Sequence, residues 1–148
     1  MLYFKVNKIV RRIINQLTDK PRVLFLIDGL GALLTAFFLF VVLRNFNDYV
    51  GMPIWILNSL SLIAVCFCVY SAACFFFLKQ HWTPFIIGIG MANLLYCVLT
   101  FGILIIHFPI ISIAGIAYFL VEIVLICGLV YIELKVAKTI RKKKMELC

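Results

Sequence analysis

The chain has 148 residues, of which 66% are hydrophobic and 14% charged, and its formal net charge is +8. The apolar share is far above the roughly 45–50% of soluble domains, and the mean hydropathy is +1.16. This composition excludes an ordinary soluble globular domain and indicates a membrane protein. The apolar runs are joined by links of a few residues, so we expect a single membrane domain over residues 1–148.

Residues 1–20 form the first predicted element, an amphipathic helix. Its apolar side chains, from Leu2 to Leu17, fall on one helical face, and most of its basic and amide side chains fall on the other. A helix of this kind lies in the membrane interface and anchors the chain. We expect its basic residues, and those of a basic tail over residues 135–148, to contact anionic lipid headgroups: Lys5, Lys8, Arg11, Arg12, Arg141, Lys142, Lys143 and Lys144.

Four apolar runs follow, and each is long enough to cross a bilayer, which takes about 20 mainly apolar residues. They cover about residues 21–43, 53–78, 84–106 and 110–134. Short links predict that consecutive helices pack antiparallel. The predicted fold class is therefore all-α: an integral membrane four-helix bundle with up-down-up-down topology and an N-terminal amphipathic interfacial helix.

The distribution of basic residues predicts the orientation of the bundle. They flank the first and last runs, whereas the predicted outer loops contain only Arg44. By the positive-inside rule both termini are cytoplasmic, and Lys79 in the middle link agrees with this. Because the positive charge is confined to segments that border the membrane, it predicts anionic lipid as a partner and argues against nucleic acid.

Two acids, Asp28 and Glu122, lie well inside the predicted spans. Ionisable residues at such positions almost always face the bundle interior and are candidates for function. Each span also has one stripe of small or polar residues along one face, and we expect these stripes to meet at the centre of the bundle. They define a candidate buried polar, ligand or proton site (Asp28, Tyr70, Asn93, Tyr96, Tyr118 and Glu122) and candidate helix-packing positions (Gly31, Ala32, Thr35, Gly88, Ala92 and Gly115).

Two interpretations of Asp28 stay open at this point. In the first, its carboxyl pairs with Asn93 or a tyrosine hydroxyl and holds helices together. In the second, Asp28 and Glu122 flank a cavity and exchange a proton or bind a cation. Glu133 is expected to lie at the inner boundary, where pairing with nearby basic side chains accounts for it.

Other chemistries find little support in the sequence. Cys66-x-Cys68 lacks the Cys-x-x-Cys spacing of four-span thiol oxidoreductases, and the predicted outer loops have no cysteine. No His or Cys cluster has metal-ligand spacing, and phosphate-loop and hydrolase motifs are missing. We therefore predict no metal, no cofactor, no catalytic residue and no enzymatic activity.

At "IDGLGALLTAFFLFVVL", "GMP", "HWTPF", "ANLLYC" and "YFLVEI" the chain resembles a group of small four-span bacterial membrane proteins of uncharacterised function. The resemblance implies a bacterial inner membrane and supplies no activity, ligand or catalytic residue. The chain is also similar to small multidrug transporters in having four short spans and an acid in the first. It departs from them because their acid is a glutamate, and their chains are shorter and lack the basic amphipathic front end.

The sequence thus predicts a multi-pass inner-membrane protein, either a small oligomeric transporter or an ion or proton pathway that uses buried carboxyls. One alternative is a non-catalytic accessory or assembly subunit, which would bind a membrane-protein partner through small-residue stripes such as Gly88 to Ala92. Another is a membrane enzyme acting on lipid or quinone. A homo-oligomer or a membrane-protein partner is expected in the first two cases.

Overall fold

The computed structural model describes residues 2–146, with side chains from residue 4 onward, and this part of the chain is all-helical. Residues 1, 147 and 148, at the ends of the predicted interfacial helix and basic tail, lie outside the described part. The elements are α1 (Leu2–Asp19), α2 (Pro21–Phe37), the π-helix η1 (Phe38–Leu43), α3 (Asn47–Val50), α4 (Ile54–Phe77), α5 (Trp82–His107) and α6 (Ile113–Glu146).

In the described part of the chain, four helices are long and apolar enough to cross a membrane: Pro21–Leu43, Ile54–Phe77, Trp82–His107 and Ile113–Glu146. The first three begin and end within two residues of the predicted runs. The fourth begins later than predicted and continues as one helix through the described part of the basic tail.

The late start of α6 has a local cause. Ile110 N and Ile111 N both donate to His107 O, so the residues after Pro109 form a turn instead of the first helical turn. Ser112 then caps the helix, because its hydroxyl accepts a hydrogen bond of 3.2 Å from Gly115 N.

The predicted outer loop from Arg44 to Pro53 is partly helical. It contains α3, which ends at Gly51 in the left-handed conformation with a φ of 74°. Glycine suits this position because it has no Cβ to clash there. Ser112 N donates a hydrogen bond of 2.9 Å to Val50 O, so this loop contacts the link between α5 and α6.

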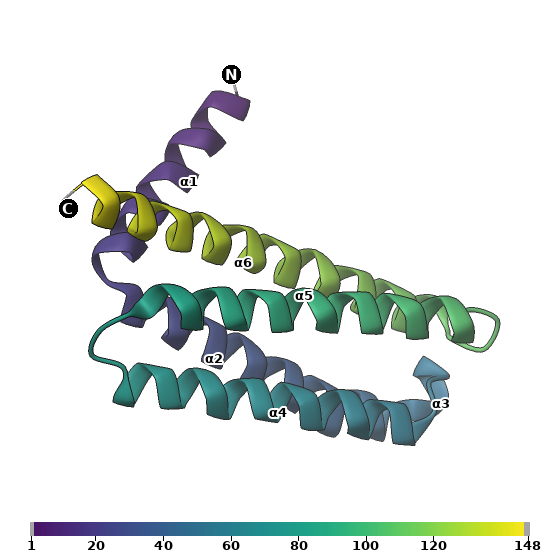
Figure 1. Cartoon of the computed structure of the whole chain (residues 1–148). Helices are drawn as coiled ribbons and strands as arrows, with labels where there is room; N and C mark the ends of the chain where they lie inside the picture. Colours follow the sequence, from purple (N-terminus) through teal and green to yellow (C-terminus); the bar gives the residue numbers. More distant parts are fainter. Residues whose placement is uncertain (1, 147–148) are drawn as a thin grey trace.

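The long helices form two closely packed pairs. Helix α2 packs along α4, α5 packs along α6, and the two pairs contact each other more sparsely (Figure 1). At the opposite end from α3, the Arg22 guanidinium donates to Leu78 O and lies over the Trp82 ring. Helix α1 lies at this same end, where it contacts α2 and α6.

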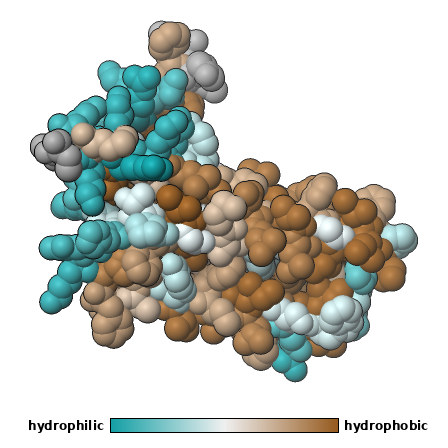
Figure 2. All heavy atoms as spheres, in the orientation of Figure 1, coloured by the Kyte–Doolittle hydropathy of each residue, from teal (hydrophilic) through white to brown (hydrophobic). Residues whose placement is uncertain are grey.

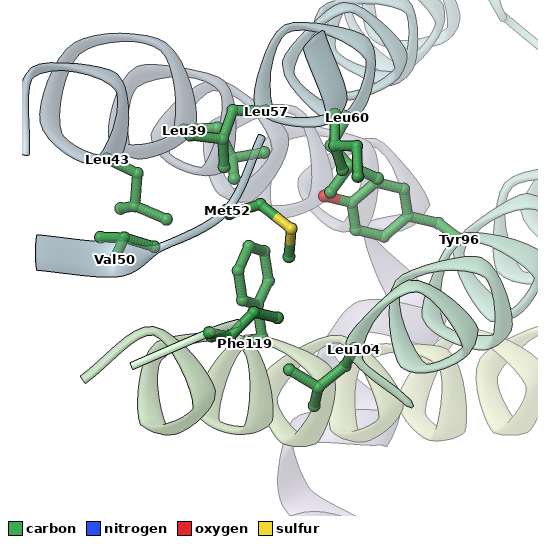
Figure 3. Close-up of a cluster of buried hydrophobic side chains, with 11 residues drawn as sticks. Leu39, Leu43, Val50, Met52, Leu57, Leu60, Tyr96, Leu104 and Phe119 are labelled. Atoms are coloured by element: carbon green, nitrogen blue, oxygen red, sulfur yellow. The ribbon is translucent and has the colours of Figure 1, made fainter. Parts of the chain in front are cut away.

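Two apolar clusters hold the pairs together. One lies toward the α3 end, where Met52 and Phe119 meet leucines from η1, α4 and α5 (Figure 3). The other lies at the α1 end, where Ile14 and Leu17 of α1 pack with Val136 and Ala137 of α6. Along its helix, Asp28 lies between the two clusters, after Phe25 of the second and before Leu39 of the first.

The surface divides sharply by polarity. Figure 2 shows hydrophilic atoms gathered around α1 and the C-terminal end of α6, whereas most of the visible helix surface is apolar. All four long helices expose large hydrophobic side chains, among them Leu34, Val69, Leu95 and Val124. Monomeric soluble proteins rarely expose contiguous apolar surface of this extent.

Candidate functional site

Asp28 on α2 is buried and holds two hydrogen bonds from other helices. Asn93 Nδ2 on α5 donates to its Oδ1 at 2.7 Å, and the Ser71 hydroxyl on α4 donates to its Oδ2. The Asn93 partner is the one expected from the sequence. Ser71 is a partner that the sequence analysis missed.

The sequence pattern of α4 hardly indicates that Ser71 is buried beside Asp28. Ser61, Ala64 and Ser71 form the small-residue stripe that α4 buries, but α4 is apolar nearly all round, so its inward face could not be told from its pattern. The sequence analysis placed Tyr70 inward instead. In the structure Tyr70 is 36% exposed and its hydroxyl donates to Phe85 O at 3.4 Å, so it lies outside the Asp28 cluster.

Glu122 on α6 forms the second polar contact. Tyr96 Oη on α5 donates to Glu122 Oε1 at 3.1 Å, while Glu122 Oε2 is buried without a hydrogen-bond partner among the described residues. Tyr118 is not part of this contact: it is half-buried, and its ring packs edge-on against Phe119.

The position of Glu133 differs from the one expected from the sequence. Its side chain is fully buried (0% exposed) and lies beside Asp28 and Asn93 instead of at a charged boundary. Neither of its carboxyl oxygens has a hydrogen-bond partner in the described part of the chain. The basic residues have other neighbours: Lys142 pairs with Glu146 and Lys143 with Asp19.

Gly90 makes room for Glu133. A Cβ on Gly90 would lie 3.2 Å from Glu133 Oε2, so α5 presents bare backbone to this carboxyl. The burial of Glu133 was missed because its neighbours in the sequence are the first basic residues of the tail, whereas its side chain packs against Gly90 of α5. Three buried carboxyls, on Asp28, Glu122 and Glu133, therefore lie inside the bundle.

A cleft between the helix pairs brings two of these acids together. Its volume is about 160 Å³, and Asp28 and Glu122 both line it. The other lining residues come from all four long helices: Gly31, Ala32, Leu34 and Thr35 on α2, Ala64 and Phe67 on α4, Asn93 and Tyr96 on α5, and Leu125, Ile126 and Leu129 on α6.

The predicted packing positions on α2 line this cleft instead of contacting a helix closely. A Cβ on Gly31 would have no atom within 4 Å, and Thr35 lies beside Glu122. The close approach of α2 to α4 occurs at Gly29, where a Cβ would lie 3.5 Å from Ser71 Cβ.

The other predicted packing positions differ in their surroundings. A Cβ on Gly115 would lie 2.8 Å from Ile111 Cγ2 and 2.9 Å from Val50 O, so Gly115 is closely packed. A Cβ on Gly88 would lie 3.3 Å from Tyr70 Oη, and Ala92 is half-buried. Part of the stripe from Gly88 to Ala92 is therefore already in contact with this chain's own side chains.

The predicted lipid-contacting residues are all exposed. They lie on α1 and on the last turns of α6, at the end of the molecule that Figure 2 shows as hydrophilic. Lys143 Nζ lies 3.1 Å from Asp19 Oδ1 and links the two helices there. The exposed residues predicted to contact lipid headgroups are Lys5, Lys8, Arg11, Arg12, Arg141, Lys142, Lys143 and Lys144.

The thiols and acids do not gather into a metal centre. Over residues 2–146 the structure contains no group of three or more His, Cys, Asp or Glu side chains that could hold a metal ion. Cys97 and Cys127 are neighbours, with their sulfur atoms 3.9 Å apart at the contact of α5 with α6. Cys148 lies outside the described residues.

Comparisons with protein-family models, with curated proteins and with solved structures found no match for this chain. The resemblance to small four-span bacterial membrane proteins stays an expectation from the sequence.

Proposed function

We propose that the protein is a multi-pass membrane protein that moves protons through the cleft between its helix pairs. The four long helices would cross the bilayer in up-down-up-down order. Their exposed apolar side chains support this, because water is a poor environment for so much apolar surface and lipid is a good one.

The proposed orientation has both termini on the cytoplasmic side of a bacterial inner membrane. Helix α1, the end of α6 and the link that holds Lys79 lie at one end of the molecule, and these segments contain nearly all of its basic residues. Arg44 is at the opposite end, near α3. The positive-inside rule assigns the basic end to the cytoplasm.

Helix α1 would lie in the interface on that side. Val10, Ile14 and Leu17 of its apolar face pack against the bundle, whereas Ile9 and Ile13 on the same face are exposed. An exposed apolar sector beside a basic face suits contact with acyl chains and anionic headgroups.

The observation that carries the proposal is that Asp28 of the first span and Glu122 of the last line one cleft. A carboxyl inside a bilayer is costly and is rarely present without a partner or a function. In the described part of the chain no lysine or arginine pairs with either acid. The cleft therefore offers carboxyl groups to a mobile positive charge.

A purely structural role explains Asp28 better than Glu122. Both oxygens of Asp28 accept hydrogen bonds and join α2 to α4 and α5. Glu122 uses one oxygen and leaves Oε2 buried and unpartnered, and such a group costs about 1–3 kcal/mol or more. A proton or cation that visits the cleft supplies the missing partner.

The test is proton flux in proteoliposomes that contain a pH-sensitive dye. A K⁺ diffusion potential set with valinomycin drives protons inward, and the internal pH is followed with time. We expect the wild-type protein to raise the rate above that of protein-free liposomes, and Glu122→Gln to abolish the increase. Glu146→Gln, at an exposed site near the C-terminal end of α6, serves as the control and should behave as wild type.

Two results would overturn the proposal: a wild-type rate equal to that of empty liposomes, or full flux in Glu122→Gln. Size-exclusion profile and helical circular dichroism of each variant show whether it is folded. Asp28→Asn is expected to reduce flux and also stability, since its oxygens hold the helices together.

A further inference from the structure

The cleft opens sideways between α2 and α6, toward the surface that would face lipid. Leu34 on α2 and Leu125 on α6 both line it, yet they are 58% and 68% exposed. Helices α2 and α6 contact each other sparsely, and the space around Gly31 is open. A molecule dissolved in the membrane can therefore reach the cleft without passing through either end of the bundle.

The floor of the cleft offers an acceptor to such a molecule. Glu122 is 6% exposed, and its Oε2 has no partner among the described residues. Of the donors near the two acids, Tyr96 binds Glu122 Oε1 and Asn93 binds Asp28, which leaves the Thr35 hydroxyl beside Glu122 as a neutral donor. A ligand that brings its own N–H donors and a positive charge fits this floor better than one that brings only acceptors.

The size of the cleft limits how much of a ligand it encloses. Its volume is about 160 Å³, and an engineered apolar cavity of about 150 Å³ in another protein binds benzene. The cleft therefore holds a small head and a few carbon atoms, while the rest of a longer molecule lies along the apolar wall formed by Leu125, Ile126 and Leu129. A divalent metal is a poor fit, because it takes more oxygen ligands than are gathered here.

We propose that the cleft binds an amphipathic organic amine that enters laterally from the bilayer, with its ammonium head on Glu122 Oε2 and its apolar body between α2 and α6. This inference rests on the proposed function in that it assigns the ligand of the same cleft. It concerns binding, however, and so it can be tested without measuring transport.

The binding experiment uses the full chain in nanodiscs of zwitterionic lipid, with dansylcadaverine as the probe. This fluorophore has an aromatic body and a free primary amine. We expect a saturable fluorescence change in the presence of the protein. The N-acetylated probe, which has lost its positive charge, should bind about tenfold more weakly or worse, since hydrogen bonds between charged groups are roughly twice as strong as neutral ones.

Two variants locate the site. Glu122→Gln keeps the shape of the side chain and removes its charge, so it should weaken probe binding about tenfold. Gly31→Leu fills the cleft from α2 and should abolish binding. Its matched control is Gly128→Leu on α6, where a Cβ also has open space but the residue does not line the cleft; this variant should bind as wild type.

Several outcomes would overturn the inference. These are no saturable binding to wild type beyond empty nanodiscs, equal binding of the acetylated probe, or unchanged binding in either Glu122→Gln or Gly31→Leu. A loss of oligomers in Gly31→Leu without amine binding to wild type would show that a second copy covers the cleft. Binding without proton flux would retain the inference and reject the proposed transport, and flux without amine binding would do the reverse.

Discussion

Asn93 Nδ2 donates a hydrogen bond of 2.7 Å to Asp28 Oδ1, and this bond joins the α5–α6 pair to the α2–α4 pair. The two pairs contact each other sparsely elsewhere, so a polar link between them has few substitutes. Ser71 holds the other oxygen of the same carboxyl from α4. Asp28 is thus the one side chain in the described polar cluster that binds donors from two other helices.

Asn93→Ala should lower the free energy of unfolding by about 0.6–1.7 kcal/mol, the range that interhelical hydrogen bonds in membranes contribute. The measurement is unfolding in mixed micelles titrated with SDS. In a double-mutant cycle with Asp28→Ala the two losses should not add, because both remove the same bond. Additive losses would mean that the two side chains stabilise the fold separately.

Two serines on α4 give a matched pair. Ser71 donates to Asp28 of another helix, whereas Ser59 donates at 2.8 Å to Trp55 O of its own helix and is exposed. Ser71→Ala should cost about 1 kcal/mol of unfolding free energy, and Ser59→Ala less than about 0.5. Equal effects in the same unfolding assay would show that the Ser71 contact is energetically unimportant.

The effect of a glycine-to-alanine substitution on the free energy of unfolding should depend on the space around that glycine. At Gly115 a Cβ would meet Ile111 and Val50 at under 3 Å, and at Gly51 it would clash with Ile110 O in a left-handed backbone. Gly115→Ala and Gly51→Ala should each lower the unfolding free energy by about 1–3 kcal/mol. Gly128→Ala, in open space, should be neutral or raise it by up to about 1 kcal/mol. A Gly51→Ala protein as stable as wild type would contradict the left-handed conformation of Gly51 at the end of α3.

The proposed interfacial position of α1 can be tested with spin labels. Ile9 is 53% exposed on the apolar face, and Arg12 is exposed on the basic face. A label at Ile9→Cys should be more accessible to oxygen, which concentrates in lipid, and a label at Arg12→Cys more accessible to a water-soluble nickel chelate. Equal accessibility of the two labels to the chelate would place α1 in water and remove the interfacial assignment.

Helical spacing was enough to predict part of this site. Asp28 and Asn93 are isolated polar residues in otherwise apolar runs, so Asn93 could be named from the sequence as one of the possible partners of the Asp28 carboxyl. Ser71 could not be found in the same way, because α4 is apolar on all faces and a serine fits a lipid-facing or buried position equally well. The close pairing of helices and the cleft between the pairs depend on side-chain packing between residues that are distant in the sequence. Helical spacing alone therefore could not predict them.

The burial of Glu133 was also not predicted from the sequence, and the stability effects of replacing Glu133 and Asp28 should differ. Its carboxyl has no hydrogen-bond partner in the described structure, so replacing it with an apolar side chain of similar size leaves no donor unsatisfied. Glu133→Leu should therefore be neutral or stabilising in SDS unfolding. Asp28→Leu leaves the donors of Asn93 and Ser71 without an acceptor. It should therefore lower the free energy of unfolding by about 2 kcal/mol or more.

The same two variants separate structure from function at Glu133. If Glu133→Leu is as stable as wild type and still conducts protons, the acid has no role that these assays detect. If it is stable but has lost flux, Glu133 belongs to the proton path together with Asp28, which it lies beside. A Glu133→Leu protein as unstable as Asp28→Leu would instead mean that Glu133 holds a bond in the membrane that the described contacts do not contain, and the polar cluster would have to be redrawn around it.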